Sequence, residues 1–169
     1  MHTTTLNHQV RKLNPNRFDF RDSHLSPHII TGHYGELYLI ELLEKSGYIV
    51  WKCETTHLGD LCVVDPETGE FFSIEVKCAN ANFHGRYQFC LNKPGHTNCT
   101  WADWCALLCI DNAGTHYLYI VQPSLFQGVK QFSISSHPTR YKGKFAPMLV
   151  RGHVDFDDIR VTTSLWGYK

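Results

Sequence analysis

The sequence carries no excess of charge of either sign, and this limits the partners that it can bind. Its 169 residues include 16 Lys plus Arg and 16 Asp plus Glu, so the formal net charge is zero with His counted as neutral. A protein that coats nucleic acid through charge alone is strongly basic, so that class is excluded. A local basic patch can still bind phosphates.

Long apolar segments are also absent. No run approaches the roughly 18 apolar residues of a membrane-spanning helix, and the first residues carry no apolar segment typical of a secretory signal. Seven Cys are present, and four of them lie in or beside apolar segments: Cys53, Cys62, Cys78 and Cys109. This usage is typical of reduced cysteines. We therefore expect a cytoplasmic protein in a reducing compartment, with no membrane partner.

No Cys-x-x-Cys pair occurs, although such pairs are frequent in structural zinc sites. A zinc site nevertheless stays open as an alternative, because four residues of suitable type fall within one short segment: His96, Cys99, Cys105 and Cys109. No order of Cys, His and acid along the chain indicates a cysteine nucleophile.

The chain does have the length and apolar content of a single hydrophobic core, with 43% hydrophobic residues. We expect a polar, basic N-terminal arm over residues 1–25 and one domain over residues 26–169. Within that domain, residues 28–121 form the expected core and residues 122–169 an irregular, basic tail.

The order of the expected elements is that of an α/β or α+β domain. Ser26-Pro27 predicts a helix start and Lys45-Ser46-Gly47 its end, with Ile29, Ile40 and Leu43 on one face. Segments with the β-branched and aromatic content of strands follow, at 48–53, 61–64, 71–77, 86–91, 104–110 and 117–121. A last strand is expected within 153–163.

Two acidic residues lie where an acid needs an explanation. Glu36 falls on the apolar stripe of the expected helix, four residues before Ile40, and a buried carboxylate is costly unless it is paired or bound to a metal. Asp60 follows Gly59 at the start of an apolar strand. The alternatives are a Glu at the edge of the stripe with its carboxylate in water and an Asp that caps its own turn.

A third acid lies inside the strand at 71–77. Because side chains of a strand alternate between its faces, Glu75 and Lys77 lie on one face and Ile74 and Val76 on the other. The alternative is a solvated strand face with a weak ion pair.

The three acids can meet at one place, since Asp60 and Glu75 lie on strands joined by a turn and the helix that carries Glu36 must pack on the sheet. Their oxygens, completed by the backbone carbonyl of Val76, suit Mg²⁺ or Mn²⁺. Such a cation neutralises charge on a scissile phosphate and lowers the pKa of a bound water. Lys77 would orient that water or stabilise the developing charge.

At these residues the sequence resembles the PD-(D/E)xK nuclease superfamily. The family order of helix Glu, Asp and Glu-x-Lys is matched by Glu36, Gly59-Asp60 and Glu75-Val76-Lys77, with Gly59 in place of Pro. Gly32-His33-Tyr34-Gly35-Glu36 resembles the helix entry of Holliday-junction-resolvase-like members. Arg86-Tyr87-Gln88-Phe89 resembles the Gln-bearing strand of homing endonucleases with this fold.

The resemblance covers residues 28 to about 121. It implies a restriction-endonuclease-like αβββ(α)β core with a mixed central sheet, although residues 79–100 predict a loop or shortened helix where the family has a helix. It implies Glu36, Asp60 and Glu75 as metal ligands together with Val76, and Asp60, Glu75 and Lys77 as catalytic residues. Gln88 would lie near the phosphate or the water, and His33 could line the site.

DNA is the expected partner. Arg86 and Lys93 lie near the site in sequence and could hold the backbone beside the cut, and a second basic group follows at Arg140, Lys142 and Lys144. The alternative is an ordinary solubilising surface. Cutting both strands requires two sites, so we expect a homodimer or higher homo-oligomer.

The expected function is therefore a Mg²⁺-dependent DNA endonuclease that acts on duplex or branched DNA. Two alternatives stay open at this point. One is a catalytically silent nucleic-acid-binding module of the same fold, and the other is a ligand-binding α/β domain whose acids are surface charge.

Overall fold

The computed structural model describes residues 27–53, 58–91, 101–126, 129–135 and 148–165. Helix α2 (Pro27–Lys45) leads into a meander of β1 (Ile49–Lys52), β2 (Leu61–Val64) and β3 (Phe71–Asn80). The remaining elements follow in chain order: β4 (Arg86–Cys90), β5 (Trp104–Ile110), β6 (His116–Val121), the 3₁₀ helix η2 (Pro123–Phe126), β7 (Gln131–Ser135), β8 (Leu149–Val150) and α3 (Phe156–Leu165).

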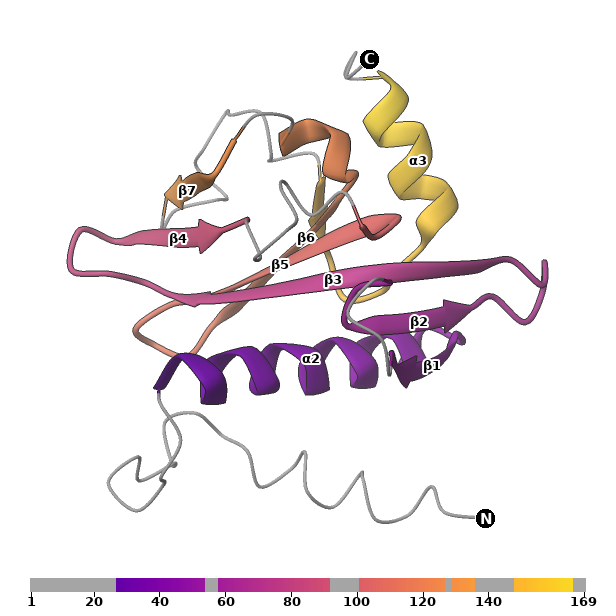
Figure 1. Cartoon of the computed structure of the whole chain (residues 1–169), viewed down its shortest axis with the longest axis horizontal. Helices are drawn as coiled ribbons and strands as arrows, with labels where there is room; N and C mark the ends of the chain where they lie inside the picture. The colour runs from indigo at the N-terminus through magenta and orange to yellow at the C-terminus, as the bar shows by residue number, and fades with distance from the viewer. Residues whose placement is uncertain (1–26, 54–57, 92–100, 127–128, 136–147, 166–169) are drawn as a thin grey trace.

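A six-stranded sheet forms the centre of the molecule, in the order β1-β2-β3-β5-β6-β8 (Figure 1). Strands β3 and β5 pair in parallel and every other neighbouring pair in this sheet is antiparallel. Strands β4 and β7 form a separate antiparallel pair, which we call the β4–β7 ribbon. The expected α/β fold with a mixed central sheet is confirmed.

Helix α2 covers one face of the sheet. Leu39 and Leu43 cluster with Ile74 and Val76 of β3, and all four are buried. Close approach of the helix requires glycine at position 35, because a Cβ there would lie 2.7 Å from the Cβ of Cys78. Glycine therefore sets the distance between α2 and β3.

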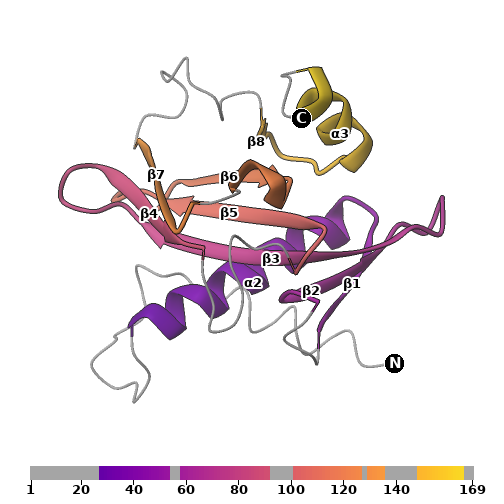
Figure 2. The same cartoon turned by 45° about the horizontal axis from the view of Figure 1, so that its top comes forward.

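The β4–β7 ribbon and η2 cover the opposite face, as Figure 2 shows with α2 on the other side of β3. Tyr87 and Phe89 of β4 and Ile134 of β7 pack with Leu107 of β5 in a second buried cluster. The odd-numbered residues of β3, which include Glu75 and Lys77, point toward this face because the even-numbered residues pack against α2. The predicted alternation of β3 is confirmed.

The stripe predicted for the first helix is wrong at its start. Ile29 is 56% exposed, whereas the buried apolar side chains of α2 are Leu37, Leu39 and Leu43. The first turns of α2 extend beyond the core. Their residues His28 and Thr31 line a cleft instead. Burial therefore begins only at Gly35, although Thr31 in the first turns already bonds to Asn80 of β3.

The C-terminal part is more regular than the predicted tail over residues 122–169. Strand β8 pairs with β6 in the central sheet, and helix α3 replaces the strand expected within 153–163. Asp155 caps this helix, because its Oδ1 accepts hydrogen bonds from the backbone N–H groups of Asp157 and Asp158 at 2.9 and 3.2 Å. Phe156 packs edge-on against Phe72 in the core.

Between β3 and β5, the described residues form β4 and no helix, and residues 92–100 lie outside the described part, as does the expected arm over residues 1–25. Over residues 79–91 this agrees with the expected departure from the family pattern, and the rest of that expectation lies outside the described residues. None of the helices in the described part is long and apolar enough to cross a membrane. A cytoplasmic location stays a prediction.

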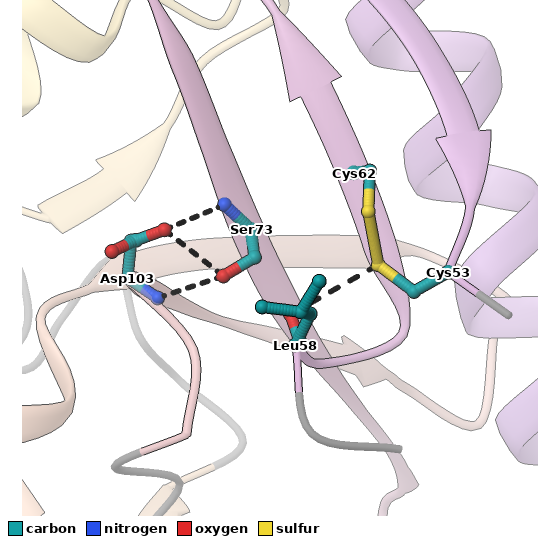
Figure 3. Close-up of a disulfide and its surroundings, with 5 residues drawn as sticks. All are labelled: Cys53, Leu58, Cys62, Ser73 and Asp103. Atoms are coloured by element: carbon teal, nitrogen blue, oxygen red, sulfur yellow. Dashed lines mark hydrogen bonds between the residues drawn. A yellow bond between two sulfur atoms is a disulfide. The ribbon is translucent and has the colours of Figure 1, made fainter. Parts of the chain in front are cut away.

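Two of the cysteines predicted to be reduced form a disulfide. Cys53 and Cys62 are bonded to each other, with their Cα atoms 5.6 Å apart (Figure 3). Cys62 lies opposite Trp51 in the β1–β2 ladder, so the end of β1 brings Cys53 within reach. Among the described residues, Cys78 and Cys109 are free as predicted.

Candidate active site

Asp60 is held at the start of β2 by the backbone of β3. Its N–H donates to the carbonyl of Ile74 at 2.9 Å, and its Oδ2 accepts from the N–H of Val76 at 2.8 Å. Gly59 precedes it with φ 92°, and a Cβ at Gly59 would lie 2.8 Å from the carbonyl oxygen of Ile74. Proline, which fixes φ near −65°, cannot adopt this conformation, which explains glycine where the family has Pro.

Asp60 lies just before β2, beside the part of β3 that carries Glu75. The paired residues of the ladder end at Leu61 and Ile74. Beyond them, Asp60 bonds to the backbone of Ile74 and Val76, the two residues on either side of Glu75. The N–H of Val76 points to the β2 side of β3, toward the Asp60 carboxylate. Because the N–H and C=O of one strand residue point to the same side, the Val76 carbonyl also faces that side.

Glu75 is a fully buried carboxylate, 0% exposed. Its Oε1 accepts from Lys77 Nζ at 2.6 Å and its Oε2 from the indole N–H of Trp101 at 2.6 Å. The Lys77 amine also lies 6.0 Å from the centre of the Trp101 ring. Since the Lys77 side chain is only 18% exposed, the alternative of a solvated strand face with a weak ion pair is wrong.

The start of β3 is fixed to the segment before β5, two residues ahead of Glu75. Oδ2 of Asp103 accepts from both the N–H and the hydroxyl of Ser73, at 2.8 and 2.9 Å. The N–H of Asp103 donates in return to Ser73 Oγ at 3.2 Å. Figure 3 shows this cluster beside the Cys53–Cys62 disulfide. Residues on both sides of Glu75 are thus tied to neighbouring strands.

Glu36 lies elsewhere, on the α2 side of the sheet. Its Oε2 accepts from Lys52 Nζ of β1 at 2.6 Å, and the same amine lies 3.2 Å from Nδ1 of His33. In the part of the chain that the structure describes, no three His, Cys, Asp or Glu residues are arranged to hold a metal ion. The structure therefore brings Asp60, Glu75 and Lys77 together and gives Glu36 a lysine as its partner.

A cleft of about 850 Å³ opens beside Lys77; Asp60, Glu75 and Glu36 are not among the residues that line it. Val76 and Lys77 of β3 and Gln88 of β4 line it, together with the first turns of α2. Gln88 is exposed, as the Arg86 side chain at the start of β4 is. The cleft thus places the predicted lysine and glutamine on a single accessible surface.

Several of the predicted site residues lie outside the part of the chain that the structure describes. Four basic residues of the expected DNA-binding surface lie outside the described residues: Lys93, Arg140, Lys142 and Lys144. The same holds for His96 and Cys99 of the zinc alternative, whereas Cys105 and Cys109 are buried in the apolar cluster under the ribbon.

Free thiols near the site are poor nucleophiles. Cys78 lines the cleft, and burial raises the pKa of its thiol to about 12. Burial also raises the pKa of Cys109. Because the thiolate is the reactive form, neither group is suited to nucleophilic catalysis near neutral pH.

Sequence reasoning missed two partners of the acids. Trp101 lies 26 positions from Glu75, and no local pattern links them. Lys52, the partner of Glu36, follows from the pairing of β1 with β2 and from the packing of α2, which only the tertiary structure supplies.

No protein-family model matches the sequence, and no curated protein matches it. Among solved structures, the fold is similar to that of the bacterial homing endonuclease I-Ssp6803I, with a TM-score of 0.52. The similarity covers 70% of this chain and 85% of that chain at 16% sequence identity. The chain therefore has a nuclease-like fold. At this identity the likeness establishes the fold and leaves the activity to be argued from the site.

Proposed function

We propose that the protein is a metal-dependent DNA endonuclease of the PD-(D/E)xK type, which hydrolyses phosphodiester bonds. The observation that carries the proposal is that Asp60 bonds to the backbone on either side of the buried Glu75, while Lys77 bonds to Glu75 and lines an open cleft. The nuclease-like fold supports it.

The oxygen atoms at this place fit a hard divalent cation. Mg²⁺ binds through one or two carboxylates and completes its shell with waters and phosphate oxygens, which suits Asp60, Glu75 and the Val76 carbonyl. Lys77 and Trp101 each donate to one oxygen of the Glu75 carboxylate, and a carboxylate oxygen can accept a hydrogen bond and bind a cation at the same time. When bound, Mg²⁺ or Mn²⁺ would neutralise charge on the scissile phosphate and activate a water.

Beside the cation, Lys77 and Gln88 act on the phosphate and the attacking water. Glu75 and Trp101 hold Lys77 in place, and its Nζ donates a hydrogen bond to a phosphate oxygen as negative charge develops there. The Gln88 amide faces the same cleft and can hydrogen-bond the phosphate or the attacking water. Glu36, bonded to Lys52, acts outside this ligand set.

The proposed substrate is duplex or branched DNA. Arg86, exposed beside the cleft, would hold its backbone together with the basic residues beyond the described part. Because each chain provides one such site, cutting both strands requires a homodimer or a higher homo-oligomer.

A cleavage assay tests the proposal. The full chain is incubated with supercoiled plasmid and with a synthetic four-way junction, in Mg²⁺ or in EDTA, as wild type, Asp60→Asn and Lys77→Ala. Asp158→Asn and Lys45→Ala serve as controls, because both residues are exposed on other elements. We expect Mg²⁺-dependent cleavage that is lost in the first two variants and retained in the controls. DNA binding without cleavage in any metal would indicate a catalytically silent binding module. A protein that neither binds nor cleaves DNA would contradict a role on DNA altogether.

A further inference from the structure

The β4–β7 ribbon has one buried face and one exposed polar face. Along β4 the pattern alternates, with Tyr87 and Phe89 buried in the core. On β7, Ile134 is buried in the same cluster. The intervening side chains are exposed: Arg86, Gln88 and Cys90 on β4, and Gln131, Ser133 and Ser135 on β7.

The register sets these exposed side chains opposite one another. Arg86 pairs with Ser135, Gln88 with Ser133 and Cys90 with Gln131. Hydrogen-bonding groups dominate this face, and Arg86 contributes its one formal charge. A face built to hold phosphates alone would carry several Lys or Arg, so its chemistry favours contacts to uncharged donors and acceptors.

This face is part of the cleft that holds the proposed catalytic lysine. Gln88, Gln131 and Ser133 line the same cleft as Lys77. A DNA backbone placed at Lys77 would therefore bring the adjoining groove against the ribbon.

The dimensions of a two-stranded ribbon match the major groove. That groove is about 12 Å wide and admits such a ribbon, whereas the minor groove is about 6 Å wide and does not. Outward residues of a strand follow each other about 6.7 Å apart. This is close to two base-pair steps of about 3.4 Å, so successive residues of one strand fall opposite every second base pair.

We propose that the β4–β7 ribbon is the base-recognition element of the enzyme and contacts base edges in the major groove of duplex DNA. Gln131 would hydrogen-bond the N6 and N7 atoms of an adenine, and Ser133 would add a single hydrogen bond. This inference rests on the proposed DNA endonuclease function and assigns the sequence preference of that activity to residues apart from the metal ligands.

Selection from random duplexes tests this assignment without requiring cleavage. A pool of DNA duplexes with 20 random base pairs is bound to the full chain in EDTA, and the retained molecules are sequenced. The proteins are wild type, Gln131→Ala, Ser133→Ala and the control Asn112→Ala, an exposed amide in the turn between β5 and β6. Circular dichroism verifies that each variant is folded.

We expect wild type and Asn112→Ala to select the same motif, with at least one strongly preferred adenine. In Gln131→Ala, the preference for adenine at one position of the motif should fall about tenfold, while the preferences at the other positions stay unchanged. Retention of DNA by wild type with no preferred base would overturn the ribbon assignment, as would an unchanged motif in Gln131→Ala and Ser133→Ala. Either result leaves the nuclease proposal intact if plasmid cleavage depends on Asp60 and Lys77, so the two failures are distinguishable.

Discussion

Glu36 and Glu75 lie on opposite sides of the central sheet and are stabilised in different ways. Glu36 keeps a side chain that is 24% exposed, and its partner Lys52 is 44% exposed. Glu75 is fully buried, and both of its oxygens accept hydrogen bonds. An exposed ion pair contributes little to stability, whereas a buried carboxylate is tolerated only with good partners.

This contrast supports placing the proposed active site on the face of the sheet that carries Glu75. A buried acid held by an amine and an indole, with a second acid bonded to the backbone on either side of it, is a costly arrangement that packing alone does not require. The α2 face has an apolar cluster with its acid at the margin. The predictions below compare matched changes on the two faces.

The largest contrast is expected between the two glutamates. Glu75→Gln should lower the rate of Mg²⁺-dependent plasmid cleavage by about 100-fold or more, because it removes a carboxylate from the proposed ligand set. Glu36→Gln, the same change on the other face, should lower it by less than about tenfold. Single-turnover cleavage of supercoiled plasmid measures both rates. Equal losses in the two variants would show that the faces do not differ in this way.

The next contrast compares two glycines with positive φ. Gly59→Ala should lower the free energy of unfolding by about 2–4 kcal/mol, because left-handed strain adds to the clash with the Ile74 carbonyl. Gly69→Ala, at φ 73° with open space around it, should cost about 1 kcal/mol from strain alone. Urea denaturation measures both. A Gly59→Ala variant as stable as Gly69→Ala would show that the close approach of Gly59 to the Ile74 carbonyl does not contribute to stability.

The smallest contrast concerns the partners of the two glutamates. Trp101→Phe removes the N–H that Glu75 Oε2 accepts and should cost about 1.5–3 kcal/mol of unfolding free energy. Lys52→Ala breaks the exposed pair with Glu36 and should cost less than about 1 kcal/mol. Thermal and urea denaturation of the two variants give the comparison. A larger loss in Lys52→Ala would reverse our assignment of the buried and exposed acids.

Local sequence patterns predicted much of this architecture. The alternation of residues 71–77 placed Glu75 and Lys77 on one face, and the turn after β2 placed Asp60 nearby, because both depend on neighbours along the chain. The Asp155 cap of α3 is present in the sequence, yet the expectation for residues 153–163 is a strand, and the helix there is a correction.

Features that depend on tertiary packing were not predictable in this way. Helical periodicity shows that Glu36 lies near an apolar stripe, but it does not show which face of the sheet the helix covers. That choice separates Glu36 from Glu75 and pairs it with Lys52. Cysteine composition likewise could not reveal the Cys53–Cys62 bond, which depends on the pairing of β1 with β2.

Cation binding by the isolated protein tests the central claim most directly. Mn²⁺ is titrated into wild type, Asp60→Asn, Glu75→Gln and Glu36→Gln, and bound cation is followed by electron paramagnetic resonance without DNA. We predict one site per chain in wild type and in Glu36→Gln, with affinity lowered about tenfold or more in Asp60→Asn and Glu75→Gln. Binding that survives both of the latter changes but is lost in Glu36→Gln would contradict the account.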